Sequence, residues 1–221
     1  MKPFMDKDFM LENPTARHLF HSFAEDLPII DYHCHISPRE IYEDRRFDNL
    51  AEIWLGGRND DGSYFGDHYK WRVMRSNGTP EELVTGSAPA FEKFLAFARA
   101  LEMAIGNPMY HWCNLELKKY FGVEVPLTVD NAREIWDKCN DMLRKDPKCS
   151  VRGLIEQSSV AYVGPPTIPS TNWNGMKRSL PIPRYTSGFA PPSARTRRST
   201  STRKALLNTW ASWRAASGSL H

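Results

Sequence analysis

Acidic residues stop abruptly at Glu156, and this boundary limits how much of the chain can build a folded core. Residues 1–164 hold all 26 Asp and Glu, together with 20 of the 29 Lys and Arg. Residues 165–221 hold the other nine basic residues, no acid, and seven of the 16 prolines. A segment of this composition predicts a disordered basic tail. Arg beside Trp and Tyr also suits phosphates and bases, so a nucleic-acid-binding arm is an alternative.

Residues 1–164 contain the start and stop signals of regular secondary structure. Apolar residues at helical spacing behind capping residues predict helices, and short apolar runs predict strands. The expected helices cover residues 13–27, with Asn13 as the N-cap, and residues 89–106, 107–122 and 131–145. The expected strands lie near 27–35, as a buried strand, and at 158–164. This order of helix, strand, long helical segment and strand predicts an α/β protein.

Composition and cysteine spacing are typical of a cytoplasmic globular protein. The chain is 41% hydrophobic and 25% charged, as is usual for that class. The N-terminal stretch MKPFMDKDFM contains acids and no apolar core, so it does not predict a signal peptide. No apolar run is long enough to predict a membrane span. Cys34, Cys113, Cys139 and Cys149 form no CxxC pair, which predicts reduced thiols.

The end of the first expected strand, IIDYHCH, carries two histidines in alternation. Residues i and i+2 of a strand point to the same side, so His33 and His35 project together and Cys34 faces away. Asp31 falls on the same side as the histidines. Two imidazoles can share one divalent cation, although a zinc site needs further ligands from elsewhere in the chain. The alternative is a pair of histidines held by hydrogen bonds alone.

A second polar cluster is GDHYKWRVMRSNG at residues 66–78. It combines acid, base and hydroxyl groups with aromatic and apolar residues over a few turns. Such a mixture suits an anionic, hydroxylated ligand. The alternative is an amphipathic helix whose Arg and Lys side chains are solvated.

Six segments, taken in order, resemble the N-terminal portion of the uronate isomerases, also called glucuronate isomerases. They are FMDKDFMLENPTARHLFH, PIIDYHCHISPREI, FDNLAEIWL, GDHYKWRVMRSNG, IGNPMYHWCNLELKKYFG and SVRGLIEQSSVAYVG. The resemblance runs from residue 4 to Gly164, with a short insertion at 57–65, and GDHYKWR is its most specific part. Another metal-dependent hydrolase of the same amidohydrolase superfamily would share the HxH pair but not that segment.

The resemblance implies a metal-dependent-hydrolase-like (β/α)8 TIM barrel whose active site lies at the C-terminal ends of the strands. Residues 1–164 would then be the N-terminal part of that barrel. Strand 1 would lie near 27–35, a mostly helical insertion would cover about 36–157, and strand 2 would lie near 158–164. Two strands of a barrel should leave open edges and an uncovered apolar face.

The resemblance also implies roles for five residues. His33 and His35 would bind a divalent metal, of the Zn²⁺ type and weakly in this fragment. Tyr69 would be a catalytic hydroxyl near the substrate, and Arg72 and Arg75 would hold its carboxylate. Family members interconvert D-glucuronate and D-fructuronate, or D-galacturonate and D-tagaturonate, by moving a proton between C2 and C1. The expected partner is therefore a small-molecule uronate, with no nucleic acid and no membrane, and family members are expected to be homo-oligomers.

The segment after Gly164 fits the resemblance when it is read in another frame. Family members continue in the manner of TTDDPIDS, and such codons read one nucleotide late give PPTIPST, the sequence at 165–171. A family stretch like RPDKALNIDKEGF, read the same way, gives ARTRRSTSTRKAL, the sequence from Ala194 to Leu206. The same shift turns Asp and Glu codons into A-initial triplets, which removes the acids. Residues 165–221 are therefore expected to be translated out of frame, and the 221-residue chain to be inactive by itself. The alternative is a non-enzymatic protein whose basic tail binds nucleic acid or an acidic partner.

Overall fold

The computed structural model describes residues 4–31, 34, 36–58 and 64–163. All of these residues belong to one unit of the chain, the one that ends at Ile182. The expected out-of-frame tail at 165–221 falls outside the described residues.

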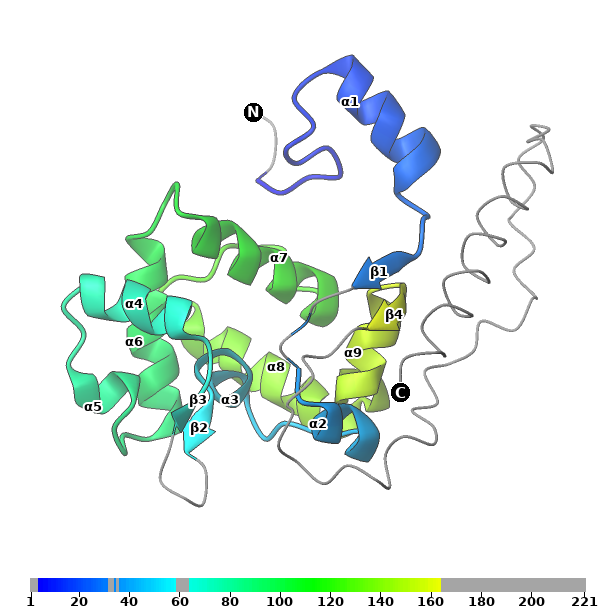
Figure 1. The fold of residues 1–221 in the computed structure, drawn as a ribbon. Helices are drawn as coiled ribbons and strands as arrows, with labels where there is room; N and C mark the ends of the chain where they lie inside the picture. Colours follow the sequence, from blue (N-terminus) through cyan, green and yellow to red (C-terminus); the bar gives the residue numbers. More distant parts are fainter. Residues whose placement is uncertain (1–3, 32–33, 35, 59–63, 164–221) are drawn as a thin grey trace, which may run out of the picture. The chain divides into compact units, whose positions relative to one another are not determined.

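The described part of the chain is mostly helical, with one small parallel sheet and one short antiparallel strand pair (Figure 1). The helices are α1 (Pro14–Leu19), α2 (Pro38–Glu43), α3 (Leu50–Leu55), α4 (His68–Ser76), α5 (Glu81–Val84), α6 (Ala90–Glu102), α7 (Pro108–Phe121), α8 (Ala132–Lys145) and α9 (Val151–Gln157), with a π-helical turn η1 (Phe20–Ala24) and a 3₁₀ turn η2 (Pro147–Cys149). The strands are β1 (Ile29–Asp31), β2 (Gly57–Arg58), β3 (Tyr64–Phe65) and β4 (Val160–Val163). The antiparallel pair β2–β3 falls at the short insertion expected at 57–65.

The capping residues begin their helices where the sequence predicts. Asn13 accepts a hydrogen bond from the Ala16 backbone at 2.9 Å, and Asn107 accepts one from the Met109 backbone at 2.9 Å. The helix expected over 13–27 is present as α1 continued by η1. The helix expected over 89–106 ends earlier, at Glu102, because the chain turns there before α7 begins.

Helices α3, α4, α5, α6, α7 and α8 contribute the buried side chains of the main hydrophobic core. Trp54 of α3 stacks on Phe94 with ring centroids 6.0 Å apart and meets Phe97 edge-on at 5.5 Å. Phe94 also contacts the Trp136 ring at 5.1 Å. These aromatic contacts join α3, α6 and α8 into one packed body. No described helix is both long enough and apolar enough to cross a bilayer.

Strands β1 and β4 pair in parallel, as two barrel strands would. Ile29 pairs with Val160 and Asp31 with Val163, and the Ile29 N–H donates to the Ser159 carbonyl at 2.9 Å. The two strands lie side by side in Figure 1. Each is shorter than the sequence predicts.

The prediction that the first strand is buried is wrong for this chain. Ile29 is 48% exposed and Ile30 is 58% exposed. Ile29 and Ile30 are adjacent in β1, so their side chains point to opposite faces of the strand pair, and both are exposed. Among the described residues, β1 has only β4 as a neighbour. The expectation of an uncovered apolar face is confirmed. The end of β4 is packed, because Val163 lies in a small second cluster with Cys34, Ile41 and Val151.

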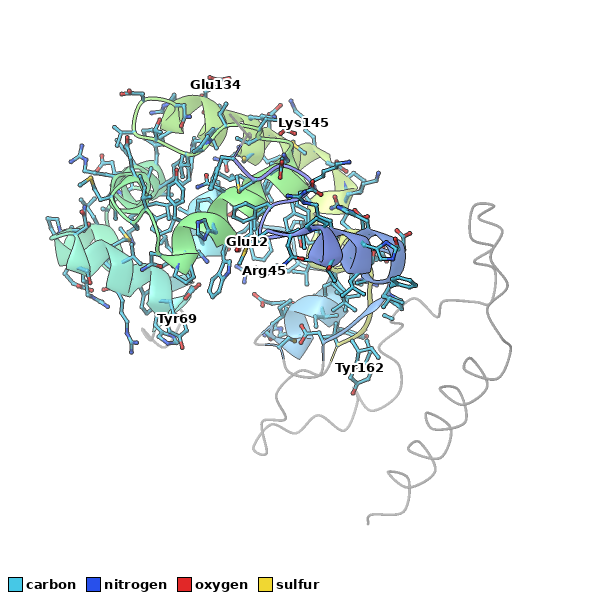
Figure 2. The ribbon with its side chains drawn as sticks, turned by 90° about the horizontal axis from the view of Figure 1, so that it is seen from above. Glu12, Arg45, Tyr69, Glu134, Lys145 and Tyr162 are labelled. Carbon is cyan, nitrogen blue, oxygen red and sulfur yellow. The ribbon has the colours of Figure 1, made fainter. Side chains whose placement is uncertain are left out.

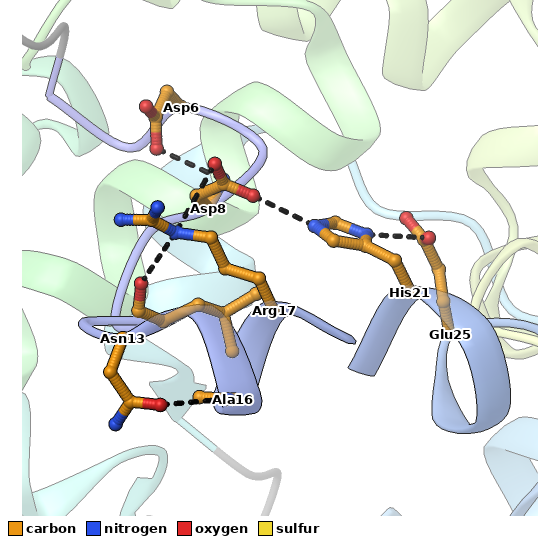
Figure 3. Close-up of polar contacts among 8 residues, drawn as sticks. Asp6, Asp8, Asn13, Ala16, Arg17, His21 and Glu25 are labelled. Carbon is orange, nitrogen blue, oxygen red and sulfur yellow. Dashed lines mark hydrogen bonds and ion pairs between the residues drawn. The ribbon is translucent and has the colours of Figure 1, made fainter. Parts of the chain in front are cut away.

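A histidine bridges the N-terminal loop and η1 (Figure 3). His21 Nε2 lies 2.8 Å from Asp8 Oδ1, and His21 Nδ1 lies 2.8 Å from Glu25 Oε2. Carboxylates only accept hydrogen bonds, so both ring nitrogens must donate, which only the imidazolium can do. The hydrogen bond to Glu25, and then the one to Asp8, raise the pKa of His21 above its ordinary value. Arg17 adds a second cation, with its Nε 3.6 Å from Asp8 Oδ2.

This bridge should make the N-terminal segment pH-dependent. Since the folded-state pKa of His21 is raised, its stabilisation is fully present below the unfolded pKa and is lost as the pH rises through the folded pKa. We expect amides of α1 and η1 to lose protection from hydrogen exchange as the pH rises above the ordinary histidine pKa of about 6.5, after correction for intrinsic exchange. His21→Gln should remove this dependence. His18→Gln is the matched control, because His18 meets the Ser22 hydroxyl at 3.1 Å and the Phe23 ring at 5.5 Å between centroids, and neither contact is with a carboxylate. An unchanged dependence in His21→Gln would contradict the assignment.

Candidate functional site

Gly66 and Trp71 fix the start of α4 against the end of α3. Gly66 has a φ of +155°, and a Cβ at that position would lie 2.3 Å from the Leu55 carbonyl oxygen, so only glycine fits there. The Trp71 indole donates a hydrogen bond to the same oxygen at 2.9 Å. Helix α4 then begins at His68 with Asp67 as its N-cap. The glycine and the tryptophan of GDHYKW therefore place the polar residues between them.

Helix α4 has one buried side and one outer side. Lys70 and Met74 are buried against the helical body. Tyr69 and Arg72 lie on the outer side, and Figure 2 shows Tyr69 at one end of α4, outside the packed helices. A groove of about 530 Å³ runs along this side, between α4, the end of α6 and the start of α7. We call it the α4 groove; its polar and aromatic lining residues are Tyr69, Arg72, Ser76, Asn77, Asn107 and Trp112.

Tyr69 and Arg72 lie together in the α4 groove. The Arg72 guanidinium carbon is 5.7 Å from the centroid of the Tyr69 ring. The His68 ring also packs against Tyr69, with 4.2 Å between the two centroids. Tyr69 is 55% exposed. Within the described part of the chain, its hydroxyl has no hydrogen-bond partner and Arg72 makes no ion pair. Both groups are therefore available to a ligand.

Arg75, the other arginine expected to bind substrate, points elsewhere. Its Nε and Nη2 donate to the two oxygens of the Glu81 carboxylate at 2.8 and 2.6 Å, and its guanidinium lies 6.0 Å from the Trp71 ring centroid. The hydrogen bond from Arg75, followed by the one from Thr85, lowers the pKa of Glu81 to about 2. Arg75 does not line the α4 groove. Its role in substrate binding stays a prediction.

Lys70 differs from the expectation of a solvated side chain. It is only 8% exposed, and its ammonium donates a hydrogen bond to Asp67 Oδ2 at 2.9 Å. Below it, the Trp54 indole donates a hydrogen bond to Glu116 Oε2 at 2.7 Å. Sequence reasoning missed Glu116 and Trp54, because each reads as an ordinary residue of an amphipathic helix and only the packing brings them under α4.

The expected metal pair, His33 and His35, lies outside the described residues. Cys34 between them is buried in the second cluster, and this burial raises the pKa of its thiol. All four cysteines are free thiols, as the spacing predicts. The residues that the structure describes contain no group of three or more His, Cys, Asp or Glu side chains suited to a metal ion.

Comparison with known proteins gives one consistent result. The family model described as glucuronate isomerase matches residues 1–173. The uronate isomerase of Lachnospira eligens is 55% identical over 163 residues, and that of Caldicellulosiruptor saccharolyticus is 50% identical over 163 residues. Each alignment covers 74% of this chain and 33% or 32% of the relative, so the chain spans about a third of the length of these relatives.

Solved structures agree with the sequence relatives. The uronate isomerase of Thermotoga maritima is 31% identical with a TM-score of 0.64, covering 73% of this chain and 33% of that one. The glucuronate isomerase of Caulobacter crescentus matches in fold, with a TM-score of 0.61 at 22% identity, over 73% of this chain and 34% of that one. The match of the family model extends beyond Gly164 by nine residues, and it covers more than half of the chain. The chain belongs to the glucuronate isomerase family.

Proposed function

We propose that this chain carries the first part of an enzyme that interconverts D-glucuronate and D-fructuronate, and D-galacturonate and D-tagaturonate, and that the 221-residue chain is inactive by itself. Family membership supports the isomerase over another hydrolase of the amidohydrolase superfamily. In this proposal β1 and β4 are strands 1 and 2 of a (β/α)8 barrel, and the helices between them are an insertion. Their parallel pairing and the exposure of Ile29 and Ile30 support that arrangement.

The observation that carries the proposed chemistry is the pairing of Tyr69 and Arg72 in the α4 groove. Aldose–ketose isomerisation moves a proton between C2 and C1 through an enediol-like intermediate, so negative charge develops on a substrate oxygen. The Tyr69 hydroxyl, which has no hydrogen-bond partner within the described residues, is suited to donate a hydrogen bond to that oxygen. Arg72 is suited to hold the carboxylate of the uronate, as a charge-assisted pair. Arg75 would have to break its two hydrogen bonds to Glu81 before it could bind a substrate carboxylate, so Arg72 is the better candidate for that role.

A divalent cation of the Zn²⁺ type is the proposed cofactor, held by His33 and His35. Two imidazoles suit such a cation, but the described residues supply no further cluster of ligands. When bound, the cation would polarise a substrate oxygen. The residues of this chain would hold it and orient the substrate beside it.

The 221-residue chain should bind zinc only weakly. With two protein ligands, most of the coordination sphere is left to water, so we expect a dissociation constant of about micromolar or weaker. Zinc calorimetry on the purified chain measures it, with His33→Ala as the test variant and His18→Ala, an exposed histidine of α1, as the control. A stoichiometric nanomolar site that His33→Ala abolishes would show that the chain supplies more ligands than proposed.

Ketose formation from D-glucuronate tests the proposed function. The protein to assay is one in which residues 1–164 continue in frame into the remaining two thirds of a uronate isomerase, beside the 221-residue chain. We expect turnover by the completed protein and none by the chain. A completed protein that folds and forms no ketose would contradict the function. Robust turnover by the 221-residue chain would contradict the claim that it is inactive.

A further inference from the structure

Lys70 is a buried cation directly beside the exposed Tyr69. Lysine is almost never buried without a partner, because its ammonium loses its hydration. Lys70 nevertheless turns inward from α4 and is only 8% exposed, whereas Tyr69 turns outward into the α4 groove. Burying the Lys70 ammonium costs free energy that a leucine at the same position would not cost, so the lysine points to a function that needs its charge.

One carboxylate binds the Lys70 ammonium directly, and a second, on another helix, contributes to its charged state. Asp67, at the start of α4, accepts its hydrogen bond at 2.9 Å. Glu116 of α7 interacts with it electrostatically and is itself held by the Trp54 indole. Burial acts to lower the pKa of Lys70, but Glu116 and Asp67 outweigh it and the pKa is raised. Lys70 is therefore a charged ammonium whose direct ion-pair partner among the described residues is Asp67.

The same Asp67 carboxylate also holds Tyr69. Its Oδ2 atom accepts from Lys70, while its Oδ1 atom accepts from the Tyr69 backbone N–H at 2.9 Å. Burial acts to raise the pKa of Asp67, but the hydrogen bond from Lys70 and the charge of Lys70 lower it, so the carboxylate stays ionised. One rigid carboxylate thus links the buried ammonium to the backbone that carries the proposed catalytic hydroxyl.

We propose that Lys70 and Asp67 are positioning residues for Tyr69. Lys70 holds Asp67 in one orientation, Asp67 caps the first turn of α4, and the fixed turn directs the Tyr69 ring into the α4 groove. This inference rests on the proposed role of Tyr69 in the isomerase reaction. A purely structural ion pair would instead stabilise the first turn of α4 without affecting how the Tyr69 side chain points.

Fluorine NMR of the 221-residue chain labelled with 3-fluorotyrosine separates the two readings. The chain has eight tyrosines, and the line that Tyr69→Phe removes belongs to Tyr69. Its contact with the His68 ring, at 4.2 Å, gives this line a position distinct from that in the urea-unfolded chain. In Lys70→Met we expect the Tyr69 line to move about halfway or further towards its unfolded position, since a released side chain averages over about three staggered wells.

Asp67→Asn removes the negative charge that pairs with Lys70 but keeps a side chain that can cap α4. Asn is as good an N-cap as Asp, so this variant keeps an acceptor for the Tyr69 N–H but weakens the link to Lys70, and we expect the Tyr69 line to move in the same direction. Glu81→Gln is the matched control, because it removes an ion pair from the other end of α4, and it should leave the line in place.

If Lys70→Met fails to fold, the double variant Lys70→Met with Asp67→Asn replaces it, since it removes both charges of the ion pair and keeps an N-cap at position 67. A Tyr69 line that stays in place in the folded Lys70 variant would overturn the proposal. A movement of all tyrosine lines together would overturn it as well, because that outcome indicates general loosening. The readout needs no turnover, so its result is separate from that of the ketose assay.

Discussion

Replacing Tyr69 with Phe in the completed isomerase should slow turnover by about 10²- to 10³-fold, equivalent to about 2.7–4 kcal/mol of transition-state stabilisation. The hydroxyl is the only group removed, and in this structure it makes no hydrogen bond within the described part of the chain. The ring contacts with His68 and Arg72 should survive the substitution. The loss should therefore fall on kcat, with a smaller change in KM.

Ketose formation from D-glucuronate measures this prediction, with circular dichroism to show that the variant is folded. Tyr42→Phe is the matched control, because Tyr42 is 56% exposed, close to the 55% of Tyr69, but lies on α2, away from the α4 groove. Tyr42→Phe should keep turnover near that of the parent enzyme. A Tyr69→Phe enzyme with unchanged kcat would show that another group stabilises the developing charge.

The sequence predicts a helix well where capping residues mark its two ends. Asn107 followed by Pro108 and closed by Gly122 predicts α7, and the structure has a helix at Pro108–Phe121 with Gly122 in the left-handed conformation. Such signals act within one turn of the chain, since a side-chain oxygen meets an N–H two or three residues away. They do not depend on what the helix packs against.

Burial is less predictable, because it depends on neighbours that are distant in sequence. Ile29 and Ile30 read as a buried strand, yet they are exposed because β1 has a single neighbour in the described part of the chain. Conversely, Asn114 reads as a surface residue of an amphipathic helix, but it is 1% exposed, and its side chain accepts a hydrogen bond from the Leu127 N–H at 2.8 Å. Only the packing of α7 against the following loop decides that position.

The candidate site divides in the same way. The sequence identifies GDHYKWR as a segment with many functional groups, but it does not show which of its charged residues can bind a ligand and which are paired within the fold. The structure separates them: Arg72 lies with Tyr69 in the α4 groove, Arg75 is paired with Glu81, and Lys70 is buried on Asp67. Each assignment requires a contact with another element or with the helix cap, so residue type and spacing could not provide it.

Phe94→Ala should destabilise the helical body by about 3–5 kcal/mol, the usual cost of deleting a fully buried aromatic side chain. Phe94 is fully buried, and its ring lies between Trp54 and Trp136, so its removal leaves a cavity that two large neighbours cannot fill without moving. A domain is stable by only about 5–15 kcal/mol, so this loss is a large share of the total. Urea unfolding followed by circular dichroism at 222 nm, a wavelength that reports helix, measures the change.

Phe91→Ala on the same helix is the matched control. Phe91 is only partly buried, with its ring under the Arg133 guanidinium at 3.5 Å and beside Trp136 at 5.5 Å. Its removal opens the surface rather than a closed cavity, so we expect a loss of about 1 kcal/mol. The difference between the two variants reports whether the helices between β1 and β4 form a packed body without the rest of the enzyme. Equal and small losses would show that this body is loosely packed in the 221-residue chain, because only a close-packed core distinguishes a buried ring from a partly exposed one.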